Sequence, residues 1–158
     1  MKKTVSTFVL LLAILSALPG NAAVVNFYSN PHVPQPLFHV SLEYKGYQYE
    51  ADPVKGGIRT LVSQVAERPD IRIAISDDLV DEAALQSQLG LAFDFNFIWN
   101  NNKTYCAKLV GIALHIPPQP MNFAGTHYVL YHPDWINRHD PGLSPDQIYE
   151  FAQKHEMP

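Results

Sequence analysis

Cysteine and positive charge are both scarce in this sequence of 158 residues. Because Cys106 is the single cysteine, a fold held together by intramolecular disulfides is excluded. The chain has 11 Lys and Arg residues against 15 Asp and Glu residues, so it lacks the basic surface that neutralises phosphate groups. We therefore expect no nucleic acid among its partners.

Other common signatures are also missing. We find no internal repeat, no low-complexity tract, no glycine-rich phosphate loop and no closely spaced set of metal ligands, so the sequence predicts no cofactor. Charged residues make up only 16% of the chain and hydrophobic residues 47%, which is typical of a protein that buries a core. The length fits one domain.

The one long hydrophobic run lies at the N-terminus. Lys2 and Lys3 precede an apolar stretch over 8–18, which ends at a Pro-Gly pair followed by small residues. This order of segments is typical of a secretory signal peptide. We expect residues 1–22 to be removed, leaving a more acidic domain over 23–158 that is exported to the periplasm or secreted. The competing interpretation is an uncleaved membrane anchor, but the run is shorter than the roughly 18 apolar residues that a spanning helix needs.

The surroundings of Cys106 predict a helix with one apolar face. Apolar side chains recur with helical spacing from Cys106 to Leu114, and Thr104 is placed to act as the N-cap. Cys106 would then lie in the first turn, where free N–H groups and the helix dipole favour a thiolate and could also bind an oxyanion. The alternatives are an inert buried thiol or an intermolecular disulfide.

A cysteine nucleophile needs a base, and His39 is the best placed of the seven histidines. It lies in an alternating segment over 38–44, and the alternation resumes over 47–52 after Lys45 and Gly46, which predicts a β-hairpin. With a two-residue loop, Asp52 lies directly opposite His39 and Glu50 lies diagonal to it on the same face. Either carboxylate could orient the imidazole, and the whole polar face could also be merely solvated.

The rest of the chain predicts a mixed α+β domain with strands and helices segregated. We expect further elements as follows: strands over 56–62 and 71–75, a helix opened by residues 76–78 and ending at Gly90, a strand over 126–131, and a last helix that begins with the capping box at residues 144–147.

The segments Phe38-His39-Val40-Ser41-Leu42, Tyr49-Glu50-Ala51, Phe93-Asp94-Phe95 and Tyr105-Cys106-Ala107-Lys108 together resemble a known family. They are similar to the permuted papain-like cysteine hydrolases of the YiiX kind, which are relatives of the NlpC endopeptidases and of lecithin:retinol acyltransferase. The resemblance implies an antiparallel sheet packed against helices, with the histidine strand before the cysteine helix.

By this resemblance Cys106 is the nucleophile, His39 the base and Glu50 the residue that orients His39, with Asp52 as the alternative. Tyr105 and Ala107 would line the site around the oxyanion, although the family more often has Ser or Thr at the position of Ala107. The implied activity is cleavage of an amide or ester bond in a cell-wall peptide or a lipid-like acyl substrate, with no stable membrane insertion after signal cleavage. Two other classes stay open: a non-catalytic exported binding module with the same fold, and a metal protein that uses the histidines.

Overall fold

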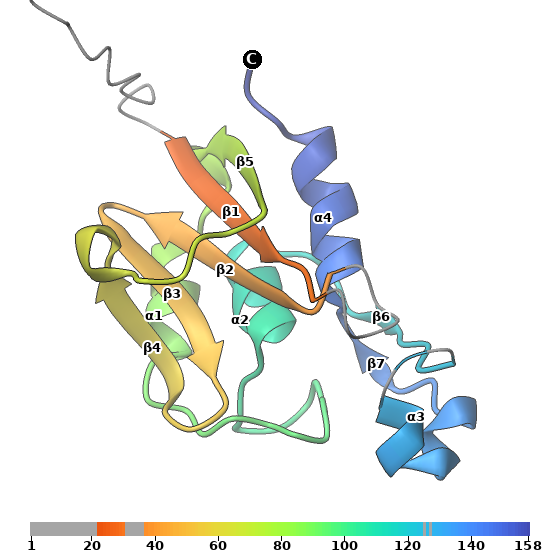
Figure 1. The fold of residues 1–158 in the computed structure, drawn as a ribbon. Coiled ribbons are helices and arrows are strands. Elements are labelled where there is room, and N and C mark those ends of the chain that lie inside the picture. Colours follow the sequence, from red (N-terminus) through yellow and green to blue (C-terminus); the bar gives the residue numbers. More distant parts are fainter. Residues whose placement is uncertain (1–21, 31–36, 125, 127) are drawn as a thin grey trace, which may run out of the picture.

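The computed structural model describes residues 22–30, 37–124, 126 and 128–158, and their fold is α+β (Figure 1). The main feature is a five-stranded antiparallel sheet with the strand order β4-β3-β2-β1-β5. Its strands are β1 (Ala22–Tyr28), β2 (His39–Tyr44), β3 (Tyr47–Asp52), β4 (Gly56–Leu61) and β5 (Ile71–Ser76). The helices are α1 (Glu82–Ser87), α2 (Cys106–Ala113), α3 (Tyr128–Tyr131) and α4 (Pro145–Lys154). The predicted antiparallel sheet packed against helices is confirmed at this level.

The hairpin of β2 and β3 has the predicted loop and register. Tyr44 pairs with Tyr47 and Leu42 with Tyr49, so the loop consists of Lys45 and Gly46. Both loop residues have positive φ, at 47° and 82°, as a tight primed turn requires. Because this short turn fixes the register, it also fixes which side chains of β2 and β3 share a face.

Strand β1 does not follow from the alternation of the sequence. It pairs with β2 at one edge and with β5 at the other, and the side chains on both of its faces are buried. Val25 and Phe27 are fully buried on one face, and Asn26 is fully buried on the other. A strand buried on both faces shows no regular alternation of apolar and polar residues, which is why this one is hard to distinguish from the apolar segment before it.

Helix α2 packs against the sheet and is buried over nearly its whole length (Figure 1). Leu109 and Val110 are fully buried against the face of the sheet that carries Val40 and Leu42. Helix α4 begins with the predicted capping box, in which Ser144 and Gln147 bond each other's backbone, and it adds Ile148 to the same core. This packing fixes the N-terminal end of α2 relative to β2.

Three local predictions are wrong. The helix expected from residue 76 is divided into a 3-10 turn (Asp77–Leu79) and α1, because Val80 is extended and Asp81 caps a new helix. Thr104 is not the N-cap of α2, since its backbone pairs with that of Phe93 and Tyr105 occupies the cap position. The strand expected over 126–131 is a short helix, α3, whose residues help to form a separate apolar cluster.

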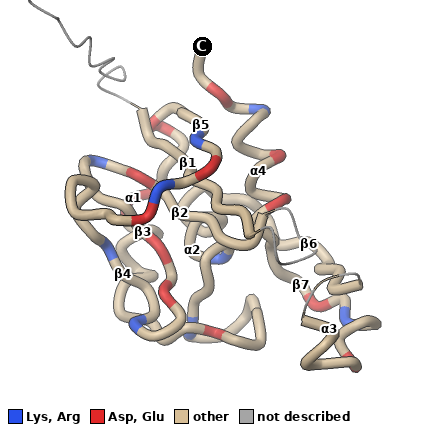
Figure 2. The backbone as a smooth tube through the Cα atoms, in the orientation of Figure 1, with Lys and Arg blue, Asp and Glu red and all other residues tan. Residues whose placement is uncertain are grey.

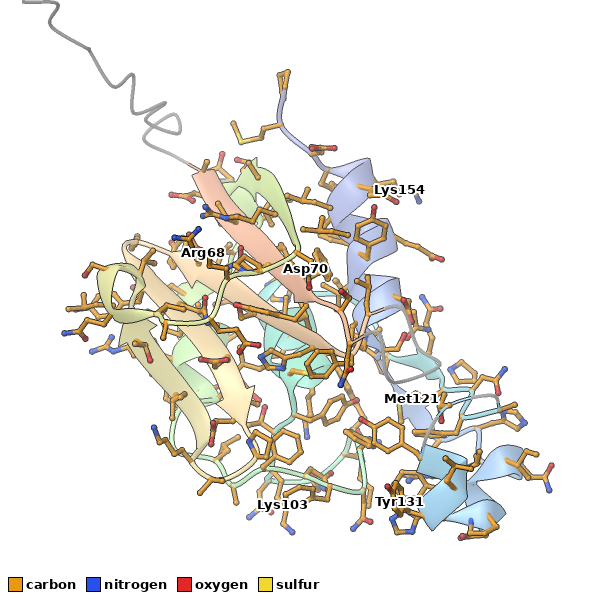
Figure 3. All side chains as sticks on the ribbon, viewed as in Figure 1. Arg68, Asp70, Lys103, Met121, Tyr131 and Lys154 are labelled. Atoms are coloured by element: carbon orange, nitrogen blue, oxygen red, sulfur yellow. The ribbon has the colours of Figure 1, made fainter. Side chains whose placement is uncertain are left out.

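That second cluster lies beyond the sheet, around the short strands β6 (Gln119–Pro120) and β7 (Pro141–Gly142), α3 and the 3-10 helix Pro133–Asn137 (Figure 1). Met121, Phe123 and Trp135 form its buried centre. Figure 3 shows Met121 in this region and Tyr131 on α3. The side chains of Leu130 and Tyr131 point outward and are 75% and 78% exposed.

Both edges of the sheet meet other parts of the chain. At β5, Met157 donates its backbone N–H to the carbonyl oxygen of Ala74 at 2.9 Å, and Glu156 forms a β-bridge with Ile75. At β4, Gly57 donates to the carbonyl oxygen of Leu91 and accepts from Gly90, both at 2.8 Å. Charges of both signs are spread over the strands, the segment between β4 and β5, and α4 (Figure 2).

The predicted signal peptide, residues 1–22, lies outside the described residues except for Ala22, which begins β1. In the described part of the chain, no helix is long and apolar enough to cross a membrane. We expect N-terminal sequencing of exported protein to start at Ala23, or within a residue or two of it, because the small residues before Ala23 suit signal cleavage. An intact Met1 terminus in a membrane pellet would instead show an anchor.

Candidate active site

Cys106 is the first residue of α2. Its N-cap, Tyr105, has an extended backbone and makes no side-chain cap, so no capping side chain takes up the N–H groups of the first turn. The thiol is free and only 8% of Cys106 is exposed, yet the residue lines a cleft. A thiol in this position is shielded from bulk water but can be reached from the cleft.

His39, the first residue of β2, lies between Cys106 and Glu50. Its Nε2 is 3.1 Å from Oε2 of Glu50, on the neighbouring strand β3. Burial alone would lower the pKa of His39, but hydrogen bonds to Cys106 and Glu50, together with their charges, raise it to about 10. The imidazole therefore contacts both side chains at once and favours its charged form.

Glu50, not Asp52, is the carboxylate at His39. The hydrogen bond from His39 is the main reason that the pKa of Glu50 is lowered, so the carboxyl group stays ionised. Asp52 instead accepts the backbone N–H groups of Val54 and Lys55 at 2.8 and 2.7 Å, and these bonds hold the turn that follows β3. Although the register puts Asp52 opposite His39, the longer and diagonal Glu50 reaches the imidazole.

Tyr105 and Ala107 both line the cleft next to Cys106. The hydroxyl oxygen of Tyr105 accepts the backbone N–H of Leu143 at 3.1 Å, and burial raises the pKa of Tyr105, so the hydroxyl stays protonated. This bond ties the start of α2 to the segment just before α4. Ala107 is fully buried and offers only its small methyl group and backbone to the cleft.

Five of the twelve residues that line the cleft beside Cys106 are aromatic, and the cavity has a volume of about 50 Å³. Among the described residues that line it there is no Asp, Glu, Lys, Arg or His. Such a surface suits an uncharged, apolar part of a ligand. The lining consists of Phe38, Phe97, Tyr105, Cys106, Ala107, Met121, Asn122, Phe123, Tyr128, Leu143, Ser144 and Pro145.

Phe97 joins the two halves of the cleft wall. Its ring packs edge-on against Tyr105 at a centroid distance of 5.3 Å and against Tyr128 at 4.9 Å. Tyr128 on α3 and Cys106 line the same cleft, and burial, together with the nearby charge of Cys106, raises the pKa of Tyr128 to about 12. The side chains of the second cluster thus form the far wall of the cleft.

The loop that carries Phe97 is held by two buried charged residues. Asp94 accepts the backbone N–H groups of Asn96 and Ile98 at 3.0 and 2.7 Å. Lys108, on α2, donates to the backbone carbonyl oxygens of Ile98, Asn101 and Lys103 at 2.7–3.3 Å, and burial lowers its pKa. Lys108 therefore fastens this loop to the helix that begins with Cys106.

The other histidines that the structure describes do not join this site. His115 pairs with Asp81 at 3.2 Å, His132 stacks on Trp135, and the remaining described histidines bond backbone carbonyl oxygens. His32 and His127 lie outside the described residues. Among the described residues no group of three His, Cys, Asp or Glu side chains could hold a metal ion.

The sequence patterns did not reveal the residues that shape the cleft or the residue that bonds Glu50. Phe97, Phe123 and Tyr128 come from separate loops and α3, and no local pattern connects them. Gln48, on the polar face of the hairpin, donates to Glu50 at 3.3 Å. Its place two residues before Glu50 on one strand was the available signal, because residues at i and i+2 share a face.

No family model, no curated protein and no solved structure matches the chain.

Proposed function

We propose that this protein is an exported cysteine hydrolase that cleaves an amide or ester bond through Cys106, His39 and Glu50. The observation that carries the proposal is His39, which contacts Cys106 and lies 3.1 Å from Glu50. A nucleophile, a base and a residue that orients the base are the three groups that this chemistry needs. Of the three, Cys106 lines a cleft from which a substrate can approach it.

The reaction follows from the roles of these groups. The Cys106 thiolate attacks the substrate carbonyl carbon, and the N–H groups at the start of α2 stabilise the oxyanion. As the carbonyl carbon loses its bond to the leaving amine or alcohol, the His39 imidazolium gives that group a proton, which leaves a thioester on Cys106. His39 then accepts a proton from water, and the resulting hydroxide attacks the thioester carbonyl carbon. The bond between that carbon and the Cys106 sulfur breaks, which releases the acid product and restores the thiolate and the imidazolium. Glu50 keeps the imidazole oriented and stabilises its charged form.

A permuted papain-like fold is part of the proposal. The histidine strand β2 precedes the cysteine helix α2 along the chain, and an antiparallel sheet packs against that helix, as the permuted arrangement requires. Export to the periplasm or to the medium rests on the N-terminal sequence, with its two lysines, apolar run and small residues.

The cleft lining bears on the choice between the two substrate classes. Because no Asp, Glu, Lys, Arg or His lines the cleft in the described part of the chain, a lipid-like acyl group suits it better than a charged stem peptide of the cell wall. Incubating the mature protein with muropeptides and with phospholipids in parallel tests this order. Release of fatty acid supports the acyl substrate, whereas cleaved muropeptides would reverse the preference.

Alkylation of Cys106 tests the proposed site without any substrate. An imidazolium beside the sulfur favours the reactive thiolate, so at pH 6.5 iodoacetamide should modify the mature protein about tenfold or more faster than a model thiol such as glutathione. His39→Ala should lose that advantage, as followed by mass spectrometry. Alkylation slower than that of glutathione, and equal in both proteins, would support an inert core thiol.

A further inference from the structure

On the face of the sheet that carries Glu50, several buried side chains are polar rather than apolar. Asn26 and Tyr28 on β1, Ser41 on β2 and Gln48 on β3 are between 0% and 3% exposed. Asn26 pairs with Ser41 across β1 and β2, and these side chains point to the same face of the sheet as Gln48. Buried polar groups are costly unless they are hydrogen-bonded, so their partners indicate what they do.

The hydrogen bonds divide the two oxygens of Glu50 between two donors. Gln48 Nε2 donates to Oε1 at 3.3 Å, while His39 Nε2 lies 3.1 Å from Oε2. A carboxylate held at both oxygens cannot rotate about its last bond without losing one of these contacts. Its orientation toward His39 is therefore set in part by Gln48.

The orientation of Gln48 is fixed in turn. Its Oε1 accepts from the Tyr28 hydroxyl at 3.3 Å and from Asn26 Nδ2 at 3.5 Å. Turning the amide over would place its oxygen against the Glu50 carboxylate and its NH2 group against two donors. Burial raises the pKa of Tyr28, so its hydroxyl keeps the proton that it donates.

From this arrangement we propose that Gln48, held by Tyr28 and Asn26, is a positioning residue that keeps Glu50 directed at His39. The inference rests on the proposed function, because Glu50 has a catalytic task only if His39 acts on Cys106. Gln48 is not among the described residues that line the cleft, and it donates to Glu50, so it acts through Glu50.

A purely structural role makes a different prediction. If Gln48 only satisfies buried polar groups, removing its amide lowers the melting temperature and leaves the titration of His39 unchanged. If it positions Glu50, its loss loosens the carboxylate that favours the imidazolium, so the pKa of His39 must fall. The titration of His39 distinguishes the two roles.

The test is an NMR titration of the His39 imidazole in the mature protein, in the absence of substrate. In the wild type the pKa of His39 should be about 10. Gln48→Met, which keeps length without hydrogen bonds, should lower it by at least about one pH unit, and Glu50→Gln should lower it further. In a hydrolysis assay the alkaline limb of the pH profile should move to lower pH in the same order.

Two further variants complete the design. Tyr28→Phe keeps the ring that packs 5.2 Å from His39 but removes the hydroxyl, so it should lower the His39 pKa less than Gln48→Met, and it serves if Gln48→Met does not fold. Gln86→Met is the matched control. Gln86 donates to the Tyr49 hydroxyl at 3.1 Å, away from His39 and Glu50, so this variant should leave the pKa of His39 unchanged.

An unchanged His39 pKa in folded Gln48→Met and Tyr28→Phe would overturn the inference. Failure of the proposed function would look different: Cys106→Ser would retain hydrolysis while the His39 pKa still responded to Gln48→Met. That second result would support the positioning of Glu50 by Gln48 and contradict the proposed function as a cysteine hydrolase.

Discussion

Replacing Glu50 by glutamine lowers the turnover number of hydrolysis by about 100-fold or more, with little loss of folding stability. Glutamine keeps the size of the side chain and a hydrogen bond to His39, but it removes the charge that stabilises the imidazolium. His39 lies 3.1 Å from Glu50 Oε2, so the loss acts directly on the base. The measurement is steady-state hydrolysis of one active substrate, with melting curves to show that the variant is folded.

Asp52→Asn is the matched control, because Asp52 holds only the turn after β3 and should change turnover by less than about twofold. Cys106→Ser and His39→Ala set the lower limit, with an expected loss of about three orders of magnitude or more. A large loss of turnover in Asp52→Asn would show instead that Asp52 orients His39. Full activity in His39→Ala would contradict the whole mechanism.

Replacing Gly56 by alanine lowers the free energy of unfolding by about 3 kcal/mol or more, the second large effect that we expect. Gly56 opens β4 with φ +75°, and an added Cβ would lie 2.0 Å from the carbonyl oxygen of Leu91. The clash is with backbone, so a change of side-chain rotamer cannot relieve it. Chemical denaturation measures the loss.

Gly90→Ala separates the clash from the backbone strain. Gly90 has a similar φ of +78°, but an added Cβ there meets nothing within 4 Å. Its alanine variant should lose only about 1 kcal/mol, which is the cost of left-handed backbone. Equal losses in both variants would show that Leu91 moves away from Gly56 at little cost.

The parts of the site that depend on local sequence, the hairpin and the start of the cysteine helix, were predicted from local sequence patterns. The alternation around Lys45 and Gly46 fixed the hairpin, and helical spacing placed Cys106 in the first turn of a helix. The choice between Glu50 and Asp52 depends on side-chain length and on the turn at 52–55, where Asp52 accepts two backbone N–H groups. An Asp followed by Pro is a common turn start, so this use of Asp52 could have been weighed from the sequence.

Other features depend on contacts between distant segments. Thr104 has the chemistry of an N-cap, but its backbone is held by Ala92 and Asp94, so the helix begins two residues later. Residues 128–131 favour a strand by composition, yet they form α3, where Tyr128 packs against Phe97 and Phe123. Tertiary packing overrides local propensity in such short segments.

The contacts at the two edges of the sheet have a consequence for handling the protein. An unpaired outer strand is a template for aggregation, because it offers free N–H and carbonyl groups to another chain. Here Met157 covers part of β5, and residues 90–91 cover part of β4. A purification tag fused directly after Pro158 would disturb the segment that shields β5. A flexible spacer before the tag should therefore keep the protein monodisperse at high concentration.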